Sequence, residues 1–282
     1  MKDYFGYKDK VCIVTGASSG MGKATAEMLV ELGAIVYALD MNECSVQGIK
    51  KFIKVNLADK NSIDSAFAVL PEKMDCFFGV AGVSGLKTDY ITTFNINYTA
   101  NMYICEKYLK SRMIEGSSIT IVSSCAGIAW REYLDECKVF SDVHDWDEVQ
   151  NKLKKLIPID APAPAAYLFS KRVVIAYANA LAIELAKNGI RVNSLLPGSA
   201  DTGMKTEFAA MAGGIENMVK DAGLAGRLAT SEEMAMPIVF LGSELSRFIN
   251  GEELIVDYCD NTLKKLGLKL NLCVGNCLPQ SK

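Results

Sequence analysis

Residues 11–22 read Val-Cys-Ile-Val-Thr-Gly-Ala-Ser-Ser-Gly-Met-Gly, and this stretch decides the fold class. The apolar run Val11–Thr15 predicts a buried strand, and the glycines after it predict a tight turn that opens a helix. Glycines let the backbone approach a pyrophosphate closely, and the start of the helix supplies N–H groups and a partial positive charge. The stretch therefore predicts the phosphate-binding turn of a dinucleotide-binding α/β domain.

Strand and helix patterns alternate along the rest of the chain. The predicted strands are Val11–Thr15, Ala34–Asp40, Phe52–Leu57, Asp75–Val80, Ser118–Ser123, Ile190–Leu196 and Glu253–Asp257. The predicted helices are Lys23–Leu32, Ile63–Leu70, Thr93–Met113, Ala166–Asn188 and Glu232–Leu241. Several strands are apolar throughout, as in a parallel sheet that helices cover on both faces. We therefore predict a single α/β domain over residues 1–282, built as a doubly wound, Rossmann-type parallel sheet of seven strands.

Two segments interrupt this alternation. Residues 130–164 form a connection much longer than is usual in a compact domain, and they hold both tryptophans and the only histidine, His144. We expect this insert to be an ordered lid, with His144 on its surface rather than in a catalytic role. The second segment is the tail 261–282, whose alternating leucines and lysines are compatible with a short amphipathic element.

Composition and charge exclude several classes of protein. The net charge is −3, with acidic and basic residues interspersed, so there is no basic stripe to bind nucleic acid. No apolar run approaches the roughly 20 residues that cross a bilayer, and the polar start of the chain does not resemble a signal peptide. The nine cysteines include no CxxC pair, so we expect free thiols and no metal site. These features predict a cytoplasmic protein with no membrane partner.

Asp40 ends the second predicted strand, eighteen residues after Gly22. A carboxylate at this position accepts hydrogen bonds from both hydroxyls of an adenosine ribose, and it repels a 2′-phosphate. Neither residue 41 nor residue 42 is basic, so nothing offsets that repulsion. An aspartate at a strand end is also a common turn former. The spacing nevertheless favours a cofactor role, and NAD rather than NADP.

Separated motifs in a fixed order resemble the short-chain dehydrogenase/reductase (SDR) family. They are TGxxxGxG at 15–22, the segment Asn95-Ile96-Asn97, Ser123-Ser124 at a strand end, YxxxK from Tyr167 to Lys171, and Ile190–Gly198 followed by Thr202. The family's NNAG reads Gly79-Val80-Ala81-Gly82 here, and its VDGG reads Val256-Asp257-Tyr258-Cys259. The long insertion before Tyr167 is similar to that of the bacterial 3α-hydroxysteroid dehydrogenase/carbonyl reductase subgroup.

The resemblance implies roles for four side chains. Tyr167 would transfer the proton, and Ser124 would hydrogen-bond the substrate oxygen. A tyrosine has an ordinary pKa of about 10. Lys171 lies one helical turn away, and its positive charge, together with that of an oxidised nicotinamide, would lower the pKa of Tyr167. Lys171 would also hold the nicotinamide ribose. Asn97 would distort its helix and hold a water in a proton relay, although an ordinary polar position is the alternative.

The same motifs predict the cofactor contacts. They are Gly16, Ser18, Ser19, Gly20, Met21, Gly22, Asp40, Met41, Asn56, Leu57, Ala81, Gly82, Tyr167, Lys171, Pro197, Gly198 and Thr202. In the family, the residue matched by Thr202 bonds the nicotinamide carboxamide.

The substrate is predicted from residues 199–226, where Met204, Met211 and Met218 offer adaptable apolar side chains. Trp130 and Trp146 could cover a flat ring system, or they could simply pack the insert. We expect a large apolar alcohol or ketone, with a hydroxysteroid or bile acid first. The alternatives are a carbonyl reductase or alcohol dehydrogenase for a smaller substrate, and a non-catalytic NAD(H)-binding sensor or scaffold.

The family resemblance also implies a homo-oligomer, a dimer or a tetramer. Family members pair through two long helices, which correspond here to Thr93–Met113 and Ala166–Asn188. The insert could obstruct that surface, so a dimer through another face is also open.

Overall fold

The computed structural model describes residues 3–271 and 273–278. Its centre is a seven-stranded parallel sheet in the order β3-β2-β1-β4-β5-β6-β7. The strands are β1 Val11–Thr15, β2 Ile35–Asp40, β3 Lys51–Lys54, β4 Cys76–Gly79, β5 Ser118–Val122, β6 Arg191–Pro197 and β7 Glu253–Val256. All seven predicted strands are therefore confirmed, with β3 showing the largest difference in its bounds.

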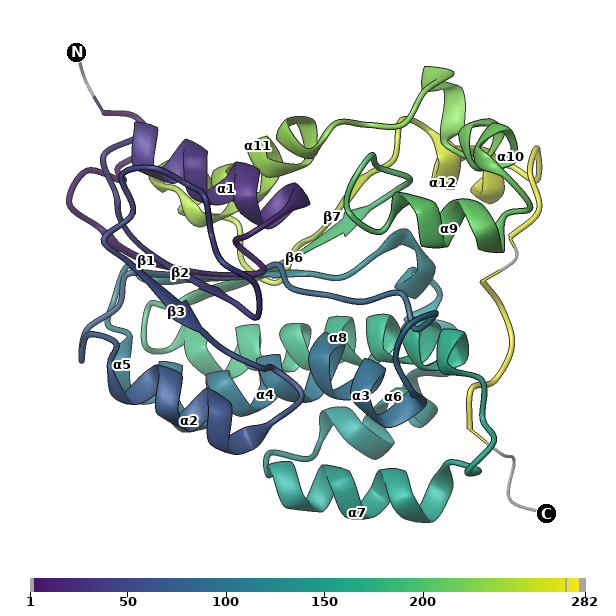
Figure 1. Cartoon of the computed structure of the whole chain (residues 1–282), viewed down its shortest axis with the longest axis horizontal. Helices are drawn as coiled ribbons and strands as arrows, with labels where there is room; N and C mark the ends of the chain where they lie inside the picture. Colours follow the sequence, from purple (N-terminus) through teal and green to yellow (C-terminus); the bar gives the residue numbers. More distant parts are fainter. Residues whose placement is uncertain (1–2, 272, 279–282) are drawn as a thin grey trace.

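Helices cover both faces of this sheet (Figure 1). One face carries α1 (Gly20–Glu31) and α11 (Ser231–Gly242), and the other carries α2 (Lys60–Ala68) and α8 (Ala163–Ala186). The strand order reverses between β1 and β4, which are neighbours in the sheet although two strands separate them in the chain. In such sheets the crevice at the carboxyl ends of the strands, beside the reversal, is where ligands bind.

The glycine turn between β1 and α1 needs its glycines for steric reasons. Gly16 and Gly20 have φ values of +71° and +53°, a region that L side chains rarely adopt. A Cβ on Gly22 would lie 2.1 Å from the carbonyl oxygen of Gly16. Turn and helix are thus packed as closely as the sequence motif predicts.

The predicted helix Thr93–Met113 is wrong in its detail, because two π turns interrupt it. The chain runs through α3 (Tyr90–Phe94), a π turn at Asn95–Thr99, α4 (Ala100–Ile104), a second π turn at Cys105–Leu109 and α5 (Lys110–Arg112). Single π turns inside helices are rare and often occur at functional sites. The first π turn contains Asn97, the position at which the family resemblance predicts a distorted helix.

The insert forms a 3₁₀ turn (Trp130–Tyr133) and two helices, α6 (Leu134–Ser141) and α7 (Trp146–Leu156). Phe140 of α6 packs against Phe94 and Phe169, with ring centroids 5.0 and 5.6 Å apart. Trp146 packs edge-on against Tyr103 at 5.5 Å. The insert therefore packs on the sides of α8 and α4 that face away from the sheet. It lies beneath the sheet in Figure 1.

The remaining helical segments are all short. They are α9 (Lys205–Met211), α10 (Ile215–Lys220), α12 (Asp260–Lys265) and the 3₁₀ turns Cys125–Gly127, Gly223–Ala225 and Glu244–Ser246. Within the predicted amphipathic tail, only the part up to Lys265 is helical among the described residues. Across residues 3–271 and 273–278, no helix has both the length and the apolarity that a membrane crossing requires.

A buried arginine joins the tail to the helix that carries the YxxxK motif. The Arg172 guanidinium is fully buried and donates hydrogen bonds to the carbonyl oxygens of Cys273 (2.8 Å) and Gly275 (2.7 Å). It also stacks on the Tyr133 ring, 4.0 Å from the ring centroid. Arg172 thereby fixes the described part of the tail, and the start of the insert, against α8.

Candidate active site

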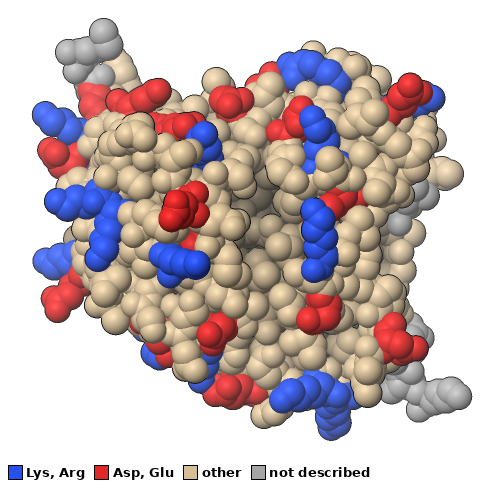
Figure 2. Space-filling view, in the orientation of Figure 1, with Lys and Arg blue, Asp and Glu red and all other residues tan. Residues whose placement is uncertain are grey.

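Two adjoining cavities open at the carboxyl ends of the strands, and Figure 2 shows the hollow in the middle of the surface. Their volumes are about 430 and 440 Å³. Five residues line both cavities: Met21, Val80, Gly82, Thr202 and Met204. A ligand that fills the first cavity can therefore extend into the second.

The first cavity, which we call the nucleotide cavity, lies over the glycine turn. Thirteen of the predicted cofactor residues line it: Gly16, Ser18, Ser19, Gly20, Met21, Gly22, Asp40, Met41, Asn56, Leu57, Ala81, Gly82 and Thr202. The other four, Tyr167, Lys171, Pro197 and Gly198, line the second cavity. The cavity is also lined by six neutral residues that no motif predicted: Asn42, Val55, Val83, Thr88, Ile96 and Gly203.

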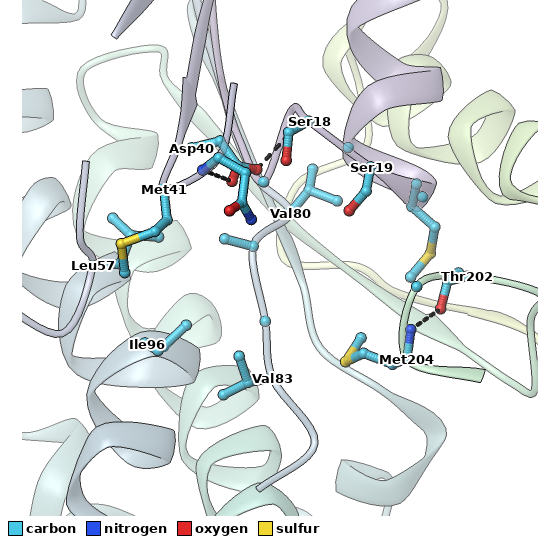
Figure 3. Close-up of a pocket in the computed structure, with 18 of the residues that line it drawn as sticks. Ser18, Ser19, Asp40, Met41, Leu57, Val80, Val83, Ile96, Thr202 and Met204 are labelled. Atoms are coloured by element: carbon cyan, nitrogen blue, oxygen red, sulfur yellow. Dashed lines mark hydrogen bonds between the residues drawn. The ribbon is translucent and has the colours of Figure 1, made fainter. Parts of the chain in front are cut away.

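Asp40 is held in a fixed orientation at the edge of the nucleotide cavity (Figure 3). One carboxylate oxygen accepts a hydrogen bond from the Ser18 N–H at 3.0 Å, and the other accepts one from the Asn42 N–H at 2.9 Å. No described residue that lines this cavity is Lys or Arg. The cavity is therefore neutral to acidic at the end of β2.

Ser124, Tyr167 and Lys171 meet in the second cavity, which we call the substrate cavity. Ser124 follows β5, and its Oγ accepts a hydrogen bond from the Ala126 N–H at 3.1 Å. Tyr167 and Lys171 come from α8, and the Lys171 ammonium lies 5.7 Å from the centroid of the Tyr167 ring. The ammonium also donates to the Val122 carbonyl oxygen at 3.0 Å. Two segments distant in the sequence thus supply one compact set of polar groups.

Burial dominates the ionisation of these groups. Desolvation raises the pKa of Tyr167 to about 12, while its hydrogen bond with Ser124 acts in the opposite direction. Desolvation also lowers the pKa of Lys171 to about 8. The expected lowering of the Tyr167 pKa includes the charge of an oxidised nicotinamide and stays a prediction for the complex. Without the cofactor, the cost of burying a phenolate dominates.

The low pKa of Lys171 predicts a pH-dependent stability. Folded Lys171 loses its proton near pH 8, whereas a lysine in the unfolded chain keeps it to about pH 10.4. Between these values the unfolded state binds more protons, so Lys171 makes the protein more stable as the pH rises. We expect a Lys171→Met variant to lack this gain. Its free energy of unfolding relative to wild type should fall by about 1–2 kcal/mol between pH 7.5 and pH 10.

Urea unfolding of both proteins at several pH values would measure this difference. Lys265→Met is the matched control, because Lys265 is exposed and lines neither cavity. A difference between Lys171→Met and wild type that stays constant with pH would contradict the shifted pKa.

Asn97 is buried beside these groups and does not line either cavity. Its side chain accepts from the Val83 N–H (2.9 Å) and donates to the Val83 carbonyl oxygen (3.0 Å) and to Ser170 Oγ (3.2 Å). A Cβ added to Gly82 would lie 3.3 Å from Asn97 Oδ1 and 3.5 Å from Lys171 Nζ, so the two side chains approach the same point. Asn97 therefore positions the chain after β4 against α8.

Asn101 explains the missing first asparagine of the NNAG pattern. A Cβ on Gly79 would lie only 2.3 Å from Asn101 Oδ1, so the Asn101 side chain occupies the space that a side chain at 79 would need. Asn101 also donates to the backbone oxygen of Asn97 at 3.2 Å. The buried asparagine at this place is thus Asn101 on α4, whereas the pattern would have an asparagine at residue 79 on β4.

The wall of the substrate cavity is largely apolar. It includes Leu168, Phe208 and all three methionines predicted to form it, Met204, Met211 and Met218. The Phe208 ring contacts the Tyr167 ring, with centroids 5.3 Å apart. An apolar wall in direct contact with the Tyr167 ring favours a substrate with a hydrophobic skeleton.

The prediction that Trp130 and Trp146 cover the substrate is wrong. Neither lines the cavity. Trp146 packs on Tyr103, and the Trp130 indole donates to a Glu253 carboxylate oxygen at 2.9 Å. Both tryptophans are buried because they fasten the insert to the core, which was the alternative interpretation.

His144 and the cysteines have no visible role in the cavities. His144 lies 3.1 Å from the Glu106 carboxylate, half-exposed and outside both cavities. All nine cysteines are free thiols, of which Cys125 and Cys273 line the substrate cavity. The described residues contain no group of three or more His, Cys, Asp or Glu that could hold a metal ion.

The chain from Asp260 onward contributes residues to the substrate cavity that no motif predicted. Asp260, Lys264, Lys269, Leu270 and Cys273 all line it. The alternating Leu–Lys pattern indicated an amphipathic segment, but nothing in the sequence indicated which part of the protein the segment would face.

A parallel sheet with a glycine turn and a Ser–Tyr–Lys set at its carboxyl edge defines a nucleotide-dependent oxidoreductase. A family model described as short chain dehydrogenase matches residues 10–133, and one described as Enoyl-(Acyl carrier protein) reductase matches residues 159–258. The chain belongs to the short-chain dehydrogenase/reductase family.

Individual relatives agree with this assignment. A coniferyl-alcohol dehydrogenase from a Pseudomonas species is 35% identical over 251 residues, covering 88% of this chain and 95% of that protein. A 3beta-hydroxysteroid dehydrogenase from Mediterraneibacter gnavus is 27% identical and covers 87% and 92%. The fold also resembles the crystal structure of a Pseudomonas 3-alpha-hydroxysteroid dehydrogenase with NADH. That likeness has a TM-score of 0.76 at 21% identity and covers 93% of this chain and 100% of the other.

Proposed function

We propose that the protein is an NAD-dependent dehydrogenase that interconverts an alcohol and a ketone or aldehyde on a large apolar skeleton. The observation that carries this proposal is the substrate cavity, in which Ser124, Tyr167 and Lys171 face a wall of methionine, leucine and phenylalanine. Hydroxysteroids and bile acids are the first substrate class. The second is an aromatic alcohol, which the 35% identity to a coniferyl-alcohol dehydrogenase favours.

The cofactor supplies the hydride acceptor when it is bound, and the residues of this chain handle the proton. Ser124 hydrogen-bonds the reacting oxygen and stabilises the charge that develops on it. Tyr167 takes the hydroxyl proton in oxidation and returns it in reduction. Lys171 lies close enough to stabilise the Tyr167 phenolate once a further positive charge enters the cavity. Asn97 holds the chain after β4 beside Lys171. We expect Asn97 also to hold a water that relays the proton from Lys171.

The choice of NAD rests on Asp40 and on the absence of Lys and Arg among the described residues of the nucleotide cavity. The two fixed oxygens of Asp40 suit the two hydroxyls of an adenosine ribose, and their charge opposes a 2′-phosphate. We also expect a homo-oligomer. Its contact would avoid the sides of α8 and α4 that the insert covers, because Phe140 packs on Phe169 of α8 and Trp146 packs on Tyr103 of α4.

The first experiment is a substrate panel with NAD and, separately, NADP. The panel contains 3-, 7-, 12- and 17-hydroxysteroids, bile acids, cinnamyl-type alcohols and simple secondary alcohols, and the absorbance of reduced cofactor is followed. NAD-linked turnover of one steroid position or of the cinnamyl-type alcohols would support the proposal and choose between its two classes. Turnover of small alcohols alone would contradict the apolar skeleton.

A further inference from the structure

The substrate cavity contains a second polar group, separate from Ser124, Tyr167 and Lys171. It consists of Asp221, which follows α10, Asp260 and Lys264 on α12, and Lys269 in the segment after α12. Apart from these four residues and the Ser–Tyr–Lys set, the lining is largely apolar. Charged groups in an apolar cavity are costly unless they are paired, so their arrangement is informative.

Hydrogen bonds in this group are unevenly distributed. The Asp260 carboxylate is almost buried and binds one lysine with each oxygen: Lys264 at 2.5 Å and Lys269 at 2.6 Å. The Lys269 ammonium has further acceptors in the Asp221 carbonyl oxygen (3.0 Å) and carboxylate (3.4 Å). Asp260 and Lys269 are therefore occupied by contacts within the protein.

Lys264 differs from Lys269. An ammonium group has three donors, and Asp260 is the only acceptor that the described residues give to Lys264. The side chain lines the cavity with only 19% of its surface exposed, so bulk water reaches it poorly. Burial lowers the pKa of Lys264, but the hydrogen bond to Asp260 and the charge of that carboxylate together outweigh burial and raise the pKa, which keeps Lys264 charged at neutral pH. Lys264 thus offers free donors and a positive charge to whatever fills the cavity.

The balance of charge favours an anion over a neutral group. Three lysines line the cavity, Lys171, Lys264 and Lys269, against one buried carboxylate, Asp260. Asp221 adds a second carboxylate, but 60% of its side chain is exposed, so solvent screens its charge. Burial raises the pKa of the Cys125 and Cys273 thiols, and the charge of the nearby Lys264 opposes this rise. The two thiols and both polar groups line one cavity.

We propose that Lys264 is a specificity-determining residue that binds an anionic oxygen of the substrate, a carboxylate or a phenolate, while Ser124 and Tyr167 bind the reacting oxygen. This inference rests on the proposed function. It narrows the substrate to an amphipathic acid whose apolar skeleton separates the anionic oxygen from the reacting oxygen. Charge-assisted hydrogen bonds are about twice as strong as neutral ones, so the acid should be preferred clearly over its neutral ester or ether.

The test compares matched acid and neutral ligands in wild type and in Lys264→Met. One pair is a hydroxysteroid carboxylic acid and its methyl ester, and the other is a 4-hydroxycinnamyl alcohol and its 4-methoxy ether, assayed above the pH at which the phenol ionises. For wild type, we expect kcat/KM to be about tenfold or more higher with one acid than with its neutral partner. The difference should come from a lower KM for the acid. Lys264→Met should remove that preference, Lys264→Arg should keep part of it, and Lys265→Met should keep all of it.

Binding of the same ligands to the protein–NADH complex, measured by calorimetry, gives a readout that needs no turnover. A carboxylate preference identifies the steroid-type acid as the source of the anion, and a phenolate preference identifies the aromatic alcohol. Equal turnover of acid and neutral ligands by wild type, or a preference that survives in Lys264→Met, would overturn the role of Lys264 and leave the dehydrogenase proposal standing. If neither pair is turned over, the proposed function is contradicted. In that case, a ratio of acid to ester binding affinity that is the same in Lys264→Met as in wild type would also reject the anion site.

Discussion

A Tyr167→Phe variant is expected to lose turnover by about three orders of magnitude while it still binds NADH. The phenol is the proposed proton-transferring group, and the substitution removes only its oxygen. The ring keeps its volume and its contact with Phe208 at 5.3 Å, so the cavity retains its shape. Steady-state rates with the best substrate of the panel, and NADH binding followed by fluorescence, would measure the two properties separately.

Tyr37→Phe is the matched control, because Tyr37 lies on β2 and lines neither cavity. If Tyr167→Phe kept more than about a tenth of the activity, another group would have to carry the proton. A wild-type protein that binds NADH tightly and turns over nothing would favour the alternative of a non-catalytic NAD(H)-binding sensor or scaffold.

A double variant, Asp40→Ser with Met41→Arg, is expected to reverse the choice of cofactor. Loss of the carboxylate removes two charge-assisted hydrogen bonds to the ribose, which should lower kcat/KM with NAD by roughly 100-fold. The added guanidinium can bind a 2′-phosphate, so kcat/KM with NADP should rise. The ratio of the two kcat/KM values, measured with one substrate, is the relevant quantity.

Two further variants separate charge from structure at this position. Asp40→Asn retains an oxygen that can still accept from the Ser18 or the Asn42 N–H, so it tests whether the charge itself matters. Glu43→Gln removes a neighbouring carboxylate that lies outside the nucleotide cavity, and it should leave the ratio unchanged. A wild-type protein that used NADP as well as NAD would show that Asp40 serves only to hold the turn.

The sheet and the residues of the glycine turn could be predicted from local features of the sequence. All seven strands were predictable because apolar runs, turns and helical stretches alternate, and each is a local property of the chain. The turn at Gly16–Gly22 was predictable because its φ angles and close contacts leave almost no choice of residue. The other motif residues in the two cavities were predictable from the resemblance of their motifs to the short-chain dehydrogenase/reductase family, and not from strand and helix patterns alone.

The surroundings of the site and the ionisation of its groups depend on contacts between distant parts of the chain, which local sequence patterns do not predict. The tryptophans of the insert are buried away from the substrate, because the apolar sides of α6 and α7 pack on the core. The tail reaches the substrate cavity because Arg172, buried on α8, binds its backbone at Cys273 and Gly275. The pKa values of Tyr167 and Lys171 depend on burial, which is a sum over contacts distant in the sequence. The same distant contacts bring Lys264 into the substrate cavity, where no local pattern could have predicted it.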